Sequence, residues 1–263
     1  MVITSLTNKK IKNLVNLLQK SKSRKEQDVF LVEGSKMFLE AKEDKVQEVY
    51  VRESFWEKEE ENGLVKKKLE KTGYELVSDE VFKKISDTIT PQGIVAVLKQ
   101  YHYNPEQFWK KDKPLLLLLE DIQDPGNLGT IVRTAEGAGV DGIIMSSNTV
   151  DIYNPKTIRS TMGSIYRIPF YYTKDLIETM DILKKQGVTV YAAHLKGEQP
   201  YHKLDYKKGT AFLIGNEGNG LKKETADRAD CYMKIPMAGQ VESLNAAVAS
   251  VILMYEAARQ RME

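Results

Sequence analysis

Four compact apolar runs in the second half of the chain constrain its fold more than any other feature. They occupy residues 115–119, 142–145, 188–193 and 211–214. A continuous apolar run of this length is typical of a strand covered on both faces, as in a mostly parallel sheet. Segments with helical periodicity lie between the runs, and a long helix is predicted at 243–261. This alternation predicts an α/β domain.

The first half predicts a second, smaller α/β domain. Asn8 can cap a helix whose apolar residues recur at helical spacing from Ile11 to Leu18. Charged helical stretches alternate with short apolar runs at 29–32, 46–51 and 94–98. Residues 101–113 carry a proline and clustered charges without clear periodicity, so we expect a linker there, unless its aromatic side chains pack between domains. The 263 residues therefore divide into a domain at 1–100, a linker at 101–113 and a domain at 114–263.

The charge of the chain is unevenly distributed. The formal net charge is only +2, yet the first 25 residues contain seven basic residues and no acidic one. Such an opening fits phosphate contacts with a nucleic acid, a solvated helix face or an organelle transit peptide. The apolar pattern continues unbroken through 30–34, which argues against the transit peptide. Since the sequence has no run long enough to span a membrane and no secretory signal core, we expect a cytoplasmic protein without membrane contact.

Several common enzyme classes lose support because their motifs are missing. The sequence has no G-x-x-x-x-G-K-[ST] phosphate loop, no G-x-G-x-x-G after the first strand of the second domain, no H-E-x-x-H and no G-x-S-x-G. Its single cysteine, Cys231, excludes an intramolecular disulfide and a cysteine-cluster metal site, and its three histidines lack metal-ligand spacing. We therefore expect no bound metal.

Three segments that follow predicted strands stand out, and the first is 120–133. Residues 124–126, Asp-Pro-Gly, predict a turn, and Asn127 predicts the cap of the helix that follows. At about 100° per residue, Arg133 lies opposite the apolar face of that helix. Arg133 is therefore either a solvated surface residue or an arginine presented to a substrate or to a second subunit.

The second segment, 212–221, is a predicted strand that enters a loop with three glycines in six residues. Asn216 and Glu217 lie among these glycines. The loop is either a plain left-handed turn or a ligand-binding loop, since loops at strand ends of α/β sheets are where ligands usually bind.

The third segment, 235–247, begins the last predicted helix. Ser243 predicts its cap, and Asn245 lies in its first turn. These residues are either caps only or part of a pocket that the three segments line together.

Together the three segments resemble the SpoU (TrmH) family of RNA ribose 2′-O-methyltransferases, within the SPOUT class. Residues 127–133 match N-x-G-x-x-x-R, 215–220 match G-x-E-G-x-G, and 235–245 match I-P-M-x-G-x-x-x-S-L-N. The resemblance covers about residues 114–261. The opening helix and residues 30–34 resemble the family's N-terminal RNA-binding domain, a fold shared with small ribosomal proteins.

The resemblance implies a C-terminal domain threaded into a deep trefoil knot, and a homodimer with its active site near the interface. It implies methyl transfer from S-adenosylmethionine to a ribose 2′-hydroxyl of RNA, which requires no metal. The implied cofactor contacts are Gly215, Asn216, Glu217, Gly218, Ile235, Met237, Ser243, Leu244, Asn245 and Ala246. The implied catalytic residues are Arg133, Asn127, Glu217, Ser243 and Asn245.

By the same resemblance, Arg133 is the residue that activates the hydroxyl. A guanidinium stays protonated and has no acceptor, so we expect Arg133 to orient the adjoining phosphate and stabilise the developing alkoxide instead. The expected RNA contacts are Lys9, Lys10, Lys12, Lys22, Arg24, Lys25 and Arg159. The separate N-terminal domain favours 23S ribosomal RNA as substrate. The alternatives are a tRNA 2′-O-methyltransferase and an RNA-binding assembly factor without catalysis.

Overall fold

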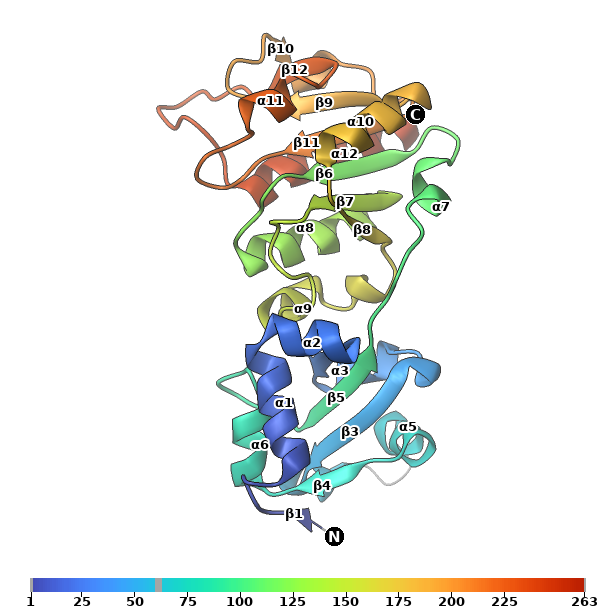
Figure 1. Cartoon of the computed structure of the whole chain (residues 1–263), viewed down its shortest axis with the longest axis vertical. Helices are drawn as coiled ribbons and strands as arrows, with labels where there is room; N and C mark the ends of the chain where they lie inside the picture. Colours follow the sequence, from blue (N-terminus) through green and yellow to red (C-terminus); the bar gives the residue numbers. More distant parts are fainter. Residues whose placement is uncertain (1, 60–62, 263) are drawn as a thin grey trace. The chain divides into compact units, whose positions relative to one another are not determined.

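The computed structural model of the protein describes residues 2–59 and 63–262 and divides into two compact units (Figure 1). The first unit comprises Met1–Tyr101 and Asp151–Tyr166, and the second comprises His102–Val150 and Arg167–Glu263. Residues 151–166 thus belong to the first unit, although the sequence places them between two stretches of the second.

The first unit is built on a mixed five-stranded sheet. Its strands are β1 (Val2–Ile3), β2 (Val29–Glu33), β3 (Val46–Arg52), β4 (Glu75–Val77) and β5 (Ile94–Lys99), in the order β1-β4-β3-β5-β2. β5 is antiparallel to both neighbours, whereas the other pairs are parallel. Its helical segments are α1 (Lys9–Gln19), α2 (Ser21–Gln27), α3 (Ser35–Glu40), η1 (Glu43–Lys45), α4 (Glu53–Trp56), α5 (Leu64–Thr72), α6 (Asp79–Ile85), α9 (Pro155–Thr161) and η2 (Ser164–Tyr166).

Helix α1 confirms the predicted opening helix. The side chain of Asn8 accepts a hydrogen bond from the N–H of Lys10 at 2.9 Å, which caps the helix. Ile11 and Leu14 are buried in the same apolar cluster as residues of β2, β3 and β5. The charged side of α1 is left to solvent, so Lys9, Lys10 and Lys12 are on the surface of this unit.

The second unit is built on a seven-stranded sheet in which every pair of neighbours is parallel, as the continuous apolar runs predicted. Its strands are β6 (Leu115–Leu119), β7 (Gly142–Ser146), β8 (Phe170–Thr173), β9 (Thr189–Ala193), β10 (Gln199–Pro200), β11 (Thr210–Ile214) and β12 (Cys231–Lys234). The order is β10-β12-β9-β11-β6-β7-β8. Its helical segments are α7 (Glu106–Trp109), α8 (Pro125–Gly137), α10 (Leu176–Lys185), η3 (Tyr201–Lys203), α11 (Lys223–Ala226) and α12 (Ala246–Met262).

Helices cover both faces of this sheet (Figure 1). Leu116 and Leu118 of β6 belong to one apolar cluster with Met180 and Leu183 of α10. On the other face, α12 packs against α8 and β11. All five residues of β6 are buried, which explains why its sequence is apolar without alternation.

Two aromatic residues of the predicted linker, Phe108 and Trp109, lie in the core of the second unit, whereas Tyr101 belongs to the first. Phe108 is 1% exposed and shares the apolar cluster of α10. Its ring lies on the backbone of Gly142, where a Cβ would approach Phe108 Cδ2 to 2.3 Å. These aromatic side chains therefore pack within one unit, a burial that the short helix α7 does not reveal through periodicity.

Two predicted helix caps are shifted. Asp124, not Asn127, caps α8 by accepting from the N–H of Asn127 at 2.8 Å. Asn245, not Ser243, caps α12 by accepting from the N–H of Ala247 at 2.8 Å. Asn127 and Ser243 are thereby released from capping, and their side chains are available for other contacts. Within the described part of the chain, no helix is long and apolar enough to cross a membrane.

Candidate functional site

The loop after the central strand β11, here called the β11 loop (residues 215–221), folds back on itself. Asn216 and Gly220 exchange backbone hydrogen bonds at 3.0 and 2.9 Å. Gly215 is required for this closure, because a Cβ there would lie 2.3 Å from the carbonyl carbon of Gly220. The side chain of Asn216 also accepts from the N–H groups of Gly218 and Asn219. The β11 loop is thus a closed structure with its own hydrogen bonds, more than a single left-handed turn.

A cavity of about 550 Å³, here called the first cavity, opens beside the β11 loop. It is within the range of roughly 300–1,000 Å³ that is typical of small-molecule sites. Nine of the ten expected cofactor residues line it: Gly215, Asn216, Glu217, Gly218, Ile235, Met237, Ser243, Leu244 and Ala246. Its lining also includes Ala193, His194 and Leu195, which the sequence analysis did not single out. The apolar run at 188–193 could have indicated them, because the strand it predicts ends at the same edge of the parallel sheet.

Glu217 connects the β11 loop to the first turn of α8. Its Oε2 accepts from the N–H of Gln123 at 3.0 Å, and its Oε1 accepts from the N–H of Asp124 and from the Asn127 amide, both at 3.0 Å. Burial alone would raise the pKa of Glu217, but these hydrogen bonds outweigh it and lower the pKa below its ordinary value. Glu217 is therefore an anion at neutral pH with both oxygens engaged, which suits a positioning residue better than a general base.

Asn127 and Asn245 extend this network to the third segment. The amide of Asn245 donates to Asn127 Oδ1 at 3.0 Å, while Asn245 Oδ1 caps α12. Asn245 is therefore the one expected cofactor residue that does not line the first cavity within the described structure. The chain Glu217–Asn127–Asn245 brings the three sequence segments together at one edge of the sheet.

Arg133 is exposed on α8 and does not line the first cavity. Within the described residues, its guanidinium has no hydrogen-bond or ion-pair partner. Helix α8 packs against α12, whose apolar residues Val248 and Tyr255 are 47% and 50% exposed. In the single chain, the apolar side chains of these two residues are therefore partly open to solvent.

The expected RNA-contacting lysines lie on the surface of the first unit. Lys9, Lys10 and Lys12 are exposed on α1, and Lys22 and Lys25 are exposed on α2. Lys10 forms an ion pair with Glu75, and Lys22 lies 3.7 Å from Glu26. Exposed pairs of this kind contribute little to stability and exchange readily for other partners.

Arg24 differs from these lysines because its side chain is buried, with 2% exposed. Its Nε and Nη2 donate to Asp151 Oδ2 at 3.0 and 2.6 Å, and its Nη1 donates to the carbonyl oxygens of Leu17 and Leu18. This burial contradicts the expectation that Arg24 contacts RNA. Arg24 instead ties the end of α1 to residue 151, a partner 127 positions away that the sequence does not reveal.

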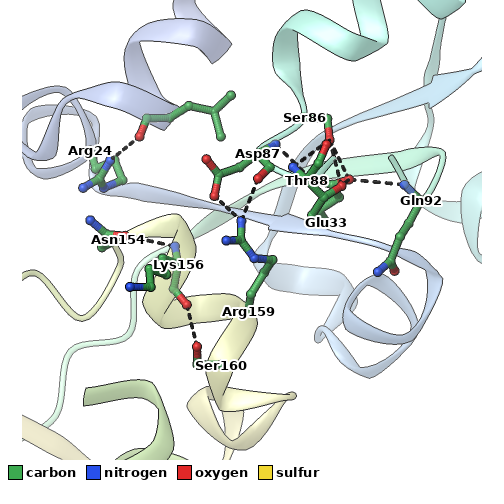
Figure 2. Close-up of polar contacts among 11 residues, drawn as sticks. Arg24, Glu33, Ser86, Asp87, Thr88, Gln92, Asn154, Lys156, Arg159 and Ser160 are labelled. Atoms are coloured by element: carbon green, nitrogen blue, oxygen red, sulfur yellow. Dashed lines mark hydrogen bonds and ion pairs between the residues drawn. The ribbon is translucent and has the colours of Figure 1, made fainter. Parts of the chain in front are cut away.

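Arg159, from α9, faces a loop that Glu33 organises, here called the 86–92 loop (Figure 2). The guanidinium of Arg159 forms an ion pair with Asp87 and also donates to its carbonyl oxygen at 3.0 Å. The Glu33 carboxylate accepts four hydrogen bonds from this loop, from Ser86 Oγ, Thr88 Oγ1 and the N–H groups of Asp87 and Gln92. The loop presents Ile89 fully to solvent.

Among the described residues, no group of three or more His, Cys, Asp and Glu side chains is arranged so that it could hold a metal ion. The polar groups at the first cavity are amides, one hydroxyl, the His194 imidazole and main-chain atoms together with a few charged side chains. This donor set suits an organic ligand.

Comparisons with known proteins match both halves of the chain to family models. Residues 114–255 match the SpoU rRNA methylase family, and residues 8–96 match an MRM3-like substrate binding domain. A 23S rRNA (guanosine(2553)-2′-O)-methyltransferase, RlmP of Bacillus subtilis, is 37% identical over 257 residues, covering 96% of this chain and 97% of its own.

Solved structures are similar over the same extent. An AdoMet-bound rRNA methyltransferase from Sinorhizobium meliloti has a TM-score of 0.84 and 33% identity, covering 98% of this chain and 97% of its own. The SpoU methyltransferase AviRb from Streptomyces viridochromogenes, in complex with AdoMet, has a TM-score of 0.87 and 26% identity, covering 97% of this chain and 99% of its own.

Proposed function

The chain belongs to the SpoU rRNA methylase family, and from this premise we propose that it transfers a methyl group from S-adenosylmethionine to a ribose 2′-hydroxyl of 23S ribosomal RNA. One observation carries the proposal. The network of Glu217, Asn127 and Asn245 joins all three family segments beside a cavity of ligand size. Each of these side chains comes from a different segment, so the network forms only in the folded domain.

The first cavity fits the cofactor. Glycine at 215 and 218 keeps side chains away from the part of the β11 loop that lines it, so a ligand can approach main-chain donors and acceptors. Ile235, Met237 and Leu244 supply apolar surface for the adenosine part. When bound, S-adenosylmethionine supplies an electrophilic methyl group on a sulfonium.

The chain's own task is to position the hydroxyl and stabilise the charge that develops on it. Arg133 carries a forked, permanently protonated donor, which matches a phosphate bidentately and can face a developing alkoxide. Asn127 and Asn245 hold the turn into α8 against the start of α12, and Ser243 is free to contact ribose or cofactor because it does not cap the helix.

Arg133 is exposed and does not line the first cavity of its own chain, which supports a homodimer in which it faces the site of a second copy. The partly exposed Val248 and Tyr255 on the neighbouring helix offer an apolar surface for that copy. We also propose the family's trefoil knot, with the segment before α12 threaded through the domain. Sedimentation should give a dimer for the native chain and a monomer for Tyr255→Asp, and a native monomer would contradict the dimer.

The match of residues 8–96 to a substrate-binding domain model, together with the 37% identity to a 23S rRNA methyltransferase over both units, supports ribosomal RNA over tRNA as substrate. The exposed lysines of the N-terminal unit would fix the RNA through phosphates while shape or unpaired bases select the site. We place this reaction in the cytoplasm.

The test is incubation of the purified protein with S-adenosylmethionine and separate 23S, 16S and tRNA fractions, followed by nucleoside analysis. The proposal predicts a 2′-O-methylnucleoside in 23S rRNA. Methylation confined to tRNA would show that the protein is a tRNA 2′-O-methyltransferase instead. Cofactor or RNA binding without methyl transfer to any fraction would identify an assembly factor instead.

A further inference from the structure

A second cavity lies on the other side of the β11 loop from the first. In the sheet, β9 and β12 lie on one side of β11, and β6 and β7 lie on the other. The first cavity is lined by residues that follow β9 and β12. The second, of about 460 Å³, is lined by residues that follow β6 and β7. Asn216, Asn219 and Gly220 line both, so the β11 loop forms a shared wall.

The charged groups of the second cavity are engaged by the protein itself. Asp121 Oδ2 lies 2.8 Å from Lys222 Nζ. The carboxylate of Glu120, 3% exposed, accepts from the N–H of Lys222 at 2.8 Å and from Thr225 Oγ1 at 2.5 Å. The lining therefore carries two carboxylates against one ammonium, a net negative charge that disfavours a phosphate group.

The other polar side chains of the lining are amides, and two of them, Gln123 and Asn219, have unused hydrogen-bonding groups. The Nε2 of Gln123 donates to the carbonyl oxygens of Asp121 and Asn148, at 3.2 and 2.9 Å. Within the described structure, Gln123 Oε1 and the side-chain amide of Asn219 have no hydrogen-bond partner. Gln123 can therefore accept a hydrogen bond and the Asn219 amide can both donate and accept, which together complement the mixed donors and acceptors of a nucleobase edge.

The floor of the second cavity is fixed before any ligand binds. Asp121 has a φ of 54°, in the left-handed region that Asp tolerates better than most residues. Ser146 Oγ accepts from the N–H of Asp121 at 2.8 Å and donates to its Oδ1 at 2.7 Å. The N–H of Gln123 is held by Glu217, so the same residue touches the network of the first cavity.

We propose that the second cavity holds the base of the nucleotide whose ribose is methylated, and that Gln123 and Asn219 contact its hydrogen-bonding edge. This inference rests on the proposed function. In-line transfer requires the 2′-hydroxyl at the methyl group, so the base attached to that ribose must lie next to the first cavity. The second cavity is the neighbouring space. Its uncharged amides suit an unstacked base, whereas its net negative charge does not suit a phosphate.

The test compares Gln123→Ala, Asn219→Ala and the double variant with Gln186→Ala, an exposed amide of the same unit that lines neither cavity. The loss of base contacts should raise the KM for RNA by roughly 10- to 100-fold and lower selectivity for the methylated nucleotide. For Gln123→Ala, whose residue lines only the second cavity, the Kd for S-adenosylmethionine and the melting temperature should match those of Gln186→Ala.

Two results would overturn the inference while the native enzyme remains active. One is an unchanged KM for RNA and an unchanged site of methylation in the double variant. The other is a loss of cofactor affinity in Gln123→Ala, which would make the second cavity part of the cofactor site. A native protein that neither binds S-adenosylmethionine nor methylates RNA would instead contradict the proposed function. Failure of the inference and failure of the proposed function are therefore distinguishable.

Discussion

A glutamate at the end of a strand organises a neighbouring loop in each of the two units. Glu33, at the end of β2, holds the 86–92 loop with four hydrogen bonds. Glu217, after β11, holds the turn into α8 with three. Both use a carboxylate as an acceptor of main-chain N–H groups, an interaction stronger than one between neutral groups.

The two loops differ in what they carry. The loop that contains Glu217 lines the first cavity, and the side-chain partner Asn127 reaches the start of α12. The loop around Glu33 faces outward, with a fully exposed Ile89 and an Asp87 that engages Arg159 (Figure 2). The same arrangement therefore forms the wall of a ligand-sized cavity in one unit and an exposed surface in the other. We expect substitutions at Glu217 to change cofactor binding and substitutions at Glu33 to change RNA binding.

The largest expected effect is that of Arg133, which lies outside both loops. Arg133→Ala should lower kcat by about 10²–10³-fold, the usual loss when one donor to a developing oxyanion is removed. Cofactor affinity should stay unchanged, because Arg133 does not line the first cavity. Single-turnover methylation and calorimetry measure the two quantities. Arg133→Lys should also be impaired, since an ammonium lacks the fork. Near-normal turnover of this variant would disprove the bidentate role.

The second effect separates the two glutamates. Glu217→Ala removes a charged acceptor of three hydrogen bonds and should weaken S-adenosylmethionine binding by roughly 10- to 100-fold. Glu33→Ala is the matched control and should leave cofactor affinity unchanged while it weakens RNA binding. Calorimetry and filter binding report the two affinities. A loss of cofactor affinity in both variants would contradict the separate roles of the two glutamates.

The pH dependence of cofactor binding tests the charge of Glu217. In the folded protein the pKa of Glu217 is lowered below its ordinary 4.5. The hydrogen bonds to charged Glu217 therefore stabilise the folded protein fully above pH 4.5, and this stabilisation is lost as the pH falls through the lowered pKa. The contribution of Glu217 to cofactor binding should therefore be flat from pH 8 to about 5. Glu217→Gln should bind more weakly across this range and converge with the native protein only in stronger acid. A difference that already vanishes near neutral pH would contradict a charged Glu217.

The smallest effect concerns the outward-facing loop. An exposed ion pair contributes about 0.2–1 kcal/mol, so Asp87→Asn should free Arg159 and strengthen RNA binding by about 1.5- to 5-fold at low salt. Arg159→Ala should weaken binding and reduce the slope of log K against log salt by about one. Equal weakening by both variants would show that Asp87 orients Arg159 for RNA and does not compete with it.

Local patterns predicted the elements of this protein more accurately than the contacts between them. The run at 115–119 predicted β6 to the residue, because a strand buried on both faces has a purely local signature. The cap positions were each misplaced by two or three residues, since several helix-start residues near 124–127 and 243–245 are suitable caps and only backbone geometry selects one.

The family motifs identified residues that line the first cavity, whereas positions that depend on tertiary contacts were missed. Motif matching predicted nine cavity-lining residues, but it did not identify the second cavity, whose Asn148 comes from a loop after β7 that belongs to none of the three segments. The burial of Arg24 was missed for the same reason. Its partner Asp151 is far away in the sequence, and a basic residue in a basic stretch is usually exposed.

The most direct test of the account is to treat unmodified 23S rRNA with the native protein and S-adenosylmethionine and to identify the methylated nucleoside by mass spectrometry. The account predicts a single 2′-O-methylnucleoside, with its methyl on the ribose, that forms in the native reaction and is lost with Arg133→Ala. A methyl group on a base, or the same yield from Arg133→Ala, would contradict it.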